Sequence, residues 1–322
     1  MADDLYLYAV ARIRSKELSL LTKADLEQLM NCKTEAECFR LLSDKGWGRT
    51  GDENSDQILG IEREKTWSLM AELVEDLSVF NTFLYMNDFH NLKAAIKQVY
   101  TNEAVPGIYI EQGTIAVETI IQSVKEHNFS VLPEDMRACA EDAYEVQMHT
   151  GDSGLCDVII DKAALETTLR KGKETGNELF GKYAELKVAV ANINIALRGC
   201  KTNKSRMFLE RALAECDSLD KQKLIDVTLQ GMEAIYSYLT ITAYEEAITA
   251  IKESSSAFEC WSDNVIMKYI QPQKYNPFTI SPLAAYIIAR ENEIKTVRII
   301  LSGKRNDIAD RLIRERLREM YV

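Results

Sequence analysis

The sequence predicts an all-α fold. Glycine and proline are scarce, numbering 14 and 5 among 322 residues. Leu, Ile, Ala, Glu and Lys, most of which favour helices, are abundant. Apolar side chains recur with the period of a helix over most of the chain, whereas almost no segment alternates with the period of a strand. We therefore expect a chain built from packed helices.

Charge and hydropathy exclude several classes of protein. The chain carries 50 acidic and 39 basic residues, a net charge of −11. This balance argues against a nucleic-acid partner, because phosphate binding needs a basic surface, and it disfavours broad docking onto anionic lipid. No apolar run approaches the ~18 residues of a membrane span, so we expect no direct membrane insertion.

The N-terminus and the cysteines indicate the compartment. The first residues, MADDLYLYAV, lack the basic segment that opens a secretory signal. The seven cysteines are odd in number, widely spaced and without a C-x-x-C pair, which favours reduced thiols over disulfides. We therefore expect a cytosolic protein, or one on the cytosolic side of a membrane.

The first third of the chain predicts a series of amphipathic helices. A helix lies within residues 1–21, with Arg12 and Arg14 on its charged side. Thr22 and Asp25 form a candidate capping box for the helix that follows. The later elements expected here are helices over 23–31 and 34–44, a polar loop over 49–57, and one or two long helices over 58–100.

The middle of the chain continues the helical pattern. The run from Cys156 to Ile160 is either a short strand or, as its length favours, the lead-in to a helix. Gly231 is expected to be tolerated inside a long helix. The helices expected in this part cover 113–125, 133–149, 163–199, 206–217 and 224–253.

Residues 276–322 predict two helices joined by a turn. Ser281 is the expected N-cap of the first helix, and Gly303 is its expected C-terminal stop. Asn306 or Asp307 is the expected cap of the second helix. Both helices carry apolar stripes with the 3.6-residue period, so we expect them to pack as a terminal helix–turn–helix.

Glu291 is a charged residue in an apolar position. It falls on the apolar stripe of the first of these helices, with Lys295 and Arg298 following at helical spacing. We expect a half-buried ion pair with one of these cations, because buried charges are rarely left unpaired. The alternative is that this face of the helix meets a partner.

One pattern occurs three times, at separations of roughly one hundred residues, too long for a solenoid unit of ~20–50 residues. An acid is followed by an amide or hydroxyl residue, an aliphatic residue, a polar or basic residue and a second aliphatic residue. The middle copy has neither the acid nor a basic residue at the fourth of these positions. Three similar helical domains would explain it, although aliphatics four apart occur in any helix. The copies are Asp88-x-x-Asn91-Leu92-Lys93-x-x-Ile96, Ala189-x-x-Asn192-Ile193-Asn194-x-x-Leu197 and Glu293-x-x-Thr296-Val297-Arg298-x-x-Leu301.

Segments at both ends of the chain match one known family. The matching residues are Tyr8-Ala9, Arg12-Ile13-Arg14, Leu20-Leu21, Pro282-Leu283, Ala285-Tyr286-Ile287, Glu291, Glu293-Ile294-Lys295, Val297-Arg298-Ile299-Ile300, Gly303-Lys304 and Ile313-Arg314-Glu315-Arg316-Leu317. In this order along the chain, the sequence resembles the C subunit of the archaeal and bacterial V-type (A/V-type) rotary ATPases, a relative of the d subunit of the vacuolar ATPase. Ala189 departs from the acid that is usual in the family at that position.

The resemblance implies a fold and a role. The fold would be three related helical bundles around a pseudo-threefold axis, shaped as a funnel, with subdomains 1–104, 105–204 and 205–322. The role would be that of a non-catalytic socket on the cytosolic face of the membrane, joining the proteolipid rotor ring to the D and F subunits of the central stalk. It would couple ATP hydrolysis to ion transport, or the reverse in synthesis.

Nine polar residues are candidates for this role. They either hold the bundles together or contact a partner, and packing is the favoured explanation. The candidates are Arg12, Arg14, Asp88, Asn91, Lys93, Asn192, Arg198, Glu293 and Arg298.

No complete catalytic motif is found in the sequence. Gly176 to Lys182 matches the G-x-x-x-x-G-K of a phosphate loop, but Tyr183 stands where Ser or Thr would bind magnesium, and no strand precedes the run. We expect no catalytic residue, no cofactor and no metal. The histidines are too few and too scattered for such a site: His90, His127 and His149.

A second class of function stays open. A helical-repeat adaptor, unrelated to rotary ATPases, could bind peptides or protein partners in a concave groove. Recovery of the chain with proteolipid and catalytic ATPase subunits would favour the coupling role. Recovery with a soluble signalling protein alone would favour the adaptor.

Overall fold

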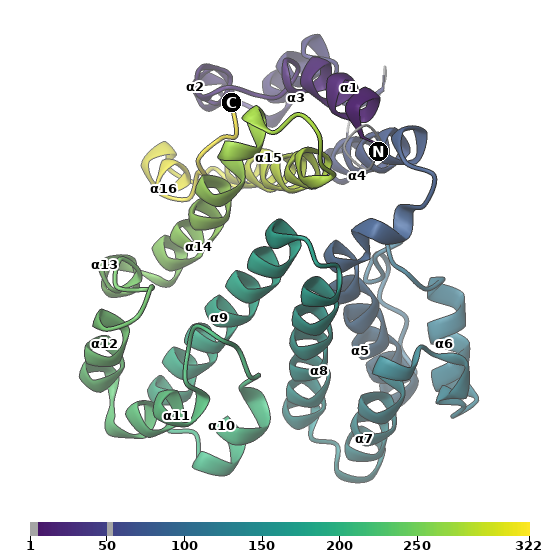
Figure 1. Ribbon diagram of the computed structural model, residues 1–322, viewed down its shortest axis with the longest axis vertical. Helices are drawn as coiled ribbons and strands as arrows, with labels where there is room; N and C mark the ends of the chain where they lie inside the picture. The colour runs from purple at the N-terminus through teal and green to yellow at the C-terminus, as the bar shows by residue number, and fades with distance from the viewer. Residues whose placement is uncertain (1–5, 50–53) are drawn as a thin grey trace. The chain divides into compact units, whose positions relative to one another are not determined.

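The computed structural model describes residues 6–49 and 54–322 and confirms the all-α prediction. It is 74% helical, and the described residues contain no strand (Figure 1). The chain forms two compact units. Unit 1 consists of Met1–Leu77 and Glu246–Val322, and unit 2 of Ser78–Glu245. The division into subdomains 1–104, 105–204 and 205–322, and their arrangement as a funnel, stay predictions.

Unit 1 is organised around α15 (Ser281–Arg305), in which every residue from 281 to 290 is buried. This helix packs on α4, α1, α3 and α14. A helix buried on all sides in this way has few positions that tolerate a change in volume. The other elements of the unit are α1 (Leu7–Glu17), α2 (Lys23–Asn31), α3 (Glu35–Asp44), α4 (Ser55–Leu73), α13 (Ala247–Glu253), α14 (Ser255–Ile270), η3 (Gln271–Tyr275) and α16 (Asp310–Arg314).

Unit 2 is organised around α8 (Ser153–Glu174), which packs on α5, α7 and α9. Figure 1 shows α5, α7 and α8 side by side, with α6 next to α5. Their shared core includes Phe89, Leu92, Ile120 and Ile160, all with almost no exposed surface. The other elements are α5 (Tyr85–Thr101), α6 (Val117–Lys125), η2 (Phe129–Val131), α7 (Glu134–Thr150), α9 (Glu178–Lys201), α10 (Arg206–Ala212), α11 (Lys221–Gln230) and α12 (Met232–Thr240), while η1 (Leu77–Phe83) begins at the unit boundary.

Local capping chemistry fixes several helix starts. The predicted capping box is confirmed: the Asp25 N–H donates to Thr22 Oγ1 at 3.3 Å, and the Thr22 N–H donates to Asp25 Oδ2 at 2.7 Å. Both donors would otherwise be unpaired at the end of α2. The expected loop over 49–57 lies partly outside the described residues, and α4 begins within it at Ser55.

Two predicted long helices are each interrupted at a glycine. The helix expected over 163–199 is two helices, because Gly176 adopts φ 66° between α8 and α9. The helix expected over 224–253 is three helices, and Gly231, at φ 119°, separates the first two. The prediction that Gly231 is tolerated inside a helix is therefore wrong, since these backbone conformations favour glycine and end a helix.

Several further boundaries differ from the prediction. The helix expected over 206–217 ends at Ala212. The run from Cys156 to Ile160 is helical, as its length favoured, but it lies inside α8, which begins at Ser153. At the C-terminus α15 begins at Ser281 itself, with Ile280 at the cap position. The second terminal helix is only the short α16.

Gly303 does not stop the helix as predicted. The helix α15 continues through it to Arg305, and Gly303 is buried. An added Cβ at this position would overlap the side chain of Ile313. The glycine is thus required by the close approach of the C-terminal segment rather than by a helix end.

Candidate functional site

The repeated pattern marks a clamp in which a helix holds a loop. In α5, Asn91 Nδ2 donates to the Ile110 carbonyl at 2.8 Å, and the Ile110 N–H donates to Asn91 Oδ1 at 2.9 Å. One turn earlier, the Asp88 carboxylate accepts the Thr114 N–H at 2.9 Å and the Thr114 hydroxyl at 2.6 Å. Burial raises the pKa of Asp88, and these hydrogen bonds oppose the rise.

The same clamp recurs in α9. Asn192 Nδ2 donates to the Ala214 carbonyl at 2.8 Å, and the Ala214 N–H donates to Asn192 Oδ1 at 3.1 Å. The acid is Glu185, which accepts the N–H of Ser218 at 2.8 Å and its hydroxyl at 2.6 Å. The acid that the sequence pattern lacks at Ala189 is therefore supplied one helical turn earlier. A search of the same helix face would have found it.

The third copy of the pattern belongs to a buried charge network. Glu293 accepts the backbone N–H of Leu21 and pairs with Arg290, which also pairs with Glu62. The side chains of Arg290, Glu62 and Glu293 are 7%, 5% and 1% exposed. The guanidinium lies over the Trp47 ring, 5.1 Å from its centroid. Sequence reasoning missed Glu62, because it lies far from Arg290 in the chain, and it missed Arg290 although this residue stands three before Glu293 on the same helix.

The electrostatics of this network follow from burial. Burial raises the pKa of Glu293, while Arg290 and the Leu21 N–H oppose the rise. Burial lowers the pKa of Arg290, but the nearby carboxylates outweigh it and raise that pKa overall. Glu62 gains further donors, the Gly48 N–H at 2.8 Å and Lys65 Nζ at 2.7 Å. The network thus fixes α15, α4 and the segment after α1 in unit 1.

Glu291 is not the buried acid of this helix. Its side chain is 39% exposed and it pairs with Arg63 Nε at 2.8 Å, so the expected pair with Lys295 or Arg298 is wrong. Lys295 Nζ instead pairs with Asp263. The apolar pattern of α15 predicted burial of Glu291 rather than of Glu293. It could not distinguish the two positions, because almost every face of the first half of this helix is buried.

The remaining candidates divide into tethered and free cations. Arg14 pairs with Glu17 at 2.6 Å and donates to carbonyls of the η3 region, and Lys93 pairs with Asp161 at 2.6 Å. Three of the candidate cations form no side-chain hydrogen bond or ion pair in the described part of the chain: Arg12, which is half-buried, and the exposed Arg198 and Arg298. The other six candidates all make internal side-chain contacts: Asp88, Asn91, Asn192, Glu293, Arg14 and Lys93.

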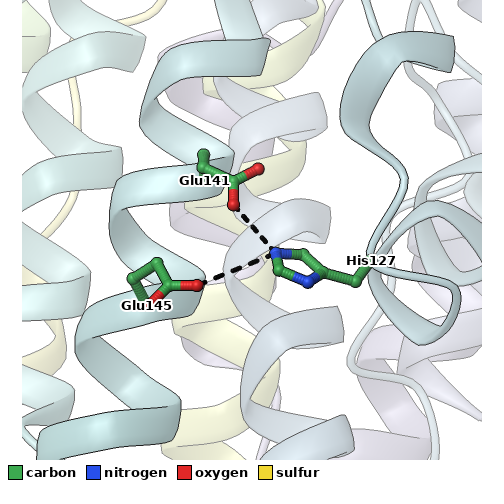
Figure 2. A group of neighbouring side chains, drawn as sticks. All are labelled: His127, Glu141 and Glu145. Carbon is green, nitrogen blue, oxygen red and sulfur yellow. Dashed lines mark hydrogen bonds and ion pairs between the residues drawn. The ribbon is translucent and has the colours of Figure 1, made fainter.

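Potential metal ligands gather at a different place in unit 2. His127, just after α6, faces Glu141 and Glu145 of α7 (Figure 2). His127 Nε2 lies 2.9 Å from Glu141 Oε1 and 4.0 Å from Glu145 Oε1. His149 Nε2 lies 2.7 Å from Glu145 Oε2. Two histidines that are separate in sequence therefore share one carboxylate, a proximity that sequence reasoning missed.

Comparison with known proteins identifies the family. The family model described as "ATP synthase (C/AC39) subunit" matches residues 9–316. The chain belongs to this family. The family is a non-catalytic subunit of the V/A-type ATPase, so the chain is not itself an enzyme.

Individual relatives of the family align over nearly the whole chain. The C subunit of the V-type sodium ATPase of Enterococcus hirae is 23% identical over 317 residues, covering 96% of this chain and 97% of the relative. The C subunit of the A-type ATP synthase of Methanocaldococcus jannaschii is 24% identical over 365 residues, covering 98% and 88%. That of Thermococcus kodakarensis is 23% identical, covering 96% and 89%. The resemblance expected from the two ends of the sequence thus extends along the chain.

Proposed function

We propose that this chain is the central-stalk subunit of a rotary V-type ATPase that joins the stalk to the membrane rotor. It would act as a socket between the D and F subunits and the proteolipid ring, on the cytosolic face of the membrane. Through it, ATP hydrolysis elsewhere in the complex would drive ion transport, of protons or sodium, or the reverse would support synthesis. The match to the subunit family over residues 9–316 carries this proposal.

The internal construction of each unit is suited to transmitting torque. A coupling element has to resist local opening, and regions with buried, hydrogen-bonded polar groups open least. The two clamps of unit 2 and the Arg290 network of unit 1 supply such groups on long helices. None of the described helices is long and apolar enough to cross a membrane, so contact with the ring would be made at its surface.

The free cations are the side chains we assign to the partner contacts. Arg12, Arg198 and Arg298 form no internal side-chain pair among the described residues. Their guanidinium groups could therefore bind a partner without breaking an internal ion pair or hydrogen bond. Arginine is enriched at protein interfaces because its planar fork pairs with carboxylates. The clamp residues would instead maintain the shape that presents these cations.

Co-purification tests the proposal. The chain, carrying an affinity tag, is recovered from detergent extracts of its source cells, and its partners are identified by mass spectrometry. We expect the D and F subunits of the stalk, the proteolipid and the catalytic subunits. Arg298→Glu should reduce their recovery, whereas Lys173→Glu, an exchange at an exposed surface pair, should not. Recovery of a soluble protein without ATPase subunits would reject the coupling role and favour an adaptor.

A further inference from the structure

Unit 2 carries a cluster of side chains whose chemistry suits a transition metal. The ligand atoms of His127, Glu141 and Glu145 all lie within 4.8 Å of one another. A zinc ion binds histidine nitrogen and carboxylate oxygen at ~2.0–2.2 Å, so two ligands of one ion are at most about 4.2 Å apart. The 2.9 and 4.0 Å separations from His127 Nε2 already satisfy this limit. Small rotations of the side chains of Glu141, which is exposed, and Glu145, which is half-buried, would bring all three ligands to one ion.

The charges of the cluster are unbalanced without a cation. Glu141 and Glu145 lie one turn apart on α7, a spacing at which like charges repel. Within residues 6–49 and 54–322, no lysine or arginine pairs with either carboxylate, and histidines are their ion-pair partners. Elsewhere in the chain, exposed acids such as Asp226 and Asp161 pair with a lysine or arginine. A divalent cation would neutralise both carboxylates together.

The imidazole is held in position by aromatic rings. The His127 ring stacks on Tyr144 with centroids 4.2 Å apart, and its edge meets Phe129 at 5.4 Å. Phe129 is buried in the core of unit 2. A ring fixed in this way loses little freedom on binding, and Nε2 is already directed at the carboxylates (Figure 2). His149 lies one turn after Glu145 on the same face of α7, pairs with its carboxylate and offers a fourth ligand.

We propose that His127, Glu141 and Glu145 bind a divalent first-row transition metal of the Zn²⁺ type, with His149 or water completing the coordination. An imidazole ligand distinguishes this class from Mg²⁺ and Ca²⁺, which prefer oxygen alone. The ion would tie the segment after α6 to α7. This inference is independent of the coupling role.

Zinc titration of the full chain, followed by NMR of the imidazole nitrogens, tests the proposal. The chain has 3 histidines, so single substitutions assign every signal. We expect Zn²⁺ to shift the His127 signal, while His90, whose Nε2 contacts the Ile108 carbonyl, stays unchanged as an internal control. A shift of His90 without His127, or no shift of His127 at saturation, would overturn the proposal.

Matched variants separate this site from the thiols. Glu145→Gln and His127→Asn should weaken Zn²⁺ binding at least ~10-fold, as loss of even an outer-shell partner does; asparagine suits the left-handed backbone at position 127, φ 48°. Glu134→Gln, the same charge change on the same helix, should leave affinity unchanged. Circular dichroism checks that each variant folds. Equal affinities for Glu145→Gln and Glu134→Gln, or a Co²⁺ complex with the charge-transfer band of a thiolate, would place the ion elsewhere and reject the site.

Discussion

Arg290→Met tests the central role of the buried charge network in unit 1. The substitution removes the cation between Glu62 and Glu293 and keeps most of the side-chain volume. Glu62 retains the Gly48 N–H and Lys65, but Glu293, 1% exposed, retains only the Leu21 N–H among its described partners. Removing one partner of a buried ion pair costs ~3–5 kcal/mol. We expect the free energy of unfolding of unit 1 to fall by that amount.

Tryptophan fluorescence during urea unfolding measures this loss. The chain's 3 tryptophans, Trp47, Trp67 and Trp261, all lie in unit 1, so their signal follows that unit alone. Arg298→Met, two turns further along α15 at an exposed position, is the matched control and should change stability by less than about 0.5 kcal/mol. The double variant Arg290→Met/Glu293→Gln should regain part of the loss, because it no longer buries an unpaired charge at Glu293.

The pH dependence of the variant supplies a second readout. Without Arg290, the pKa of Glu293 rises further above its ordinary value, so the folded state binds more protons than the unfolded state. Stability then falls as the pH increases through this range. The deficit of Arg290→Met should therefore be larger near about pH 8 than near about pH 5. A loss below about 1 kcal/mol, or a deficit independent of pH, would refute the reasoning about this network.

Three further predictions concern single positions. Gly303→Ala should destabilise unit 1 by ~1–3 kcal/mol, because the added methyl group overlaps Ile313. Gly60→Ala, whose added methyl group meets open space inside a helix, should stabilise the unit by ~0.4–1 kcal/mol. Thermal melts followed by fluorescence compare the two variants, and equal effects would contradict the packing argument. Asn192→Ala leaves the backbone N–H and carbonyl of buried Ala214 unpaired and should cost unit 2 ~1–3 kcal/mol. The loss is measured as faster hydrogen exchange in residues 213–218, and unchanged exchange would count against the clamp. Burial raises the pKa of Asp263, but its cationic partners outweigh burial and lower that pKa below 3.8. The stability advantage of the wild type over Asp263→Asn should therefore be constant above about pH 5 and disappear as the pH falls through the lowered pKa. An advantage that persists throughout an acid titration would exclude this linkage.

The fold class and the local caps could be predicted from the sequence because they depend on neighbouring residues. The capping box at Thr22 and Asp25 involves residues three apart, and helical periodicity is likewise local. Gly176 and Gly231 were harder, because a glycine inside an apolar pattern is compatible with both a helix and a break. Gly303 was predicted to end a helix but lies inside one, because a glycine is needed there for close contact with Ile313 and not for its backbone conformation.

The candidate site could be predicted only where all the residues of the sequence pattern lie on one helix. The repeated pattern identified Asn91 and Asn192, which make the same pair of hydrogen bonds to a loop. It assigned no partner to Glu293, although Arg290 stands three residues earlier on the same helix, and it could not find Glu62, which pairs with Arg290 from a helix distant in the sequence. The cluster at His127 was missed for the same reason, since its ligands come from segments whose approach depends on packing.

The coupling role is tested most directly by removing the chain from the assembled ATPase. Membrane vesicles that hold the complete complex, and vesicles that lack this one chain, are compared for ATP hydrolysis and for ATP-driven ion uptake. We predict that hydrolysis by the catalytic subunits persists without the chain while ion uptake is lost, and that adding the purified chain restores it. Ion uptake that continues unchanged in its absence would contradict the proposed connection between stalk and rotor ring.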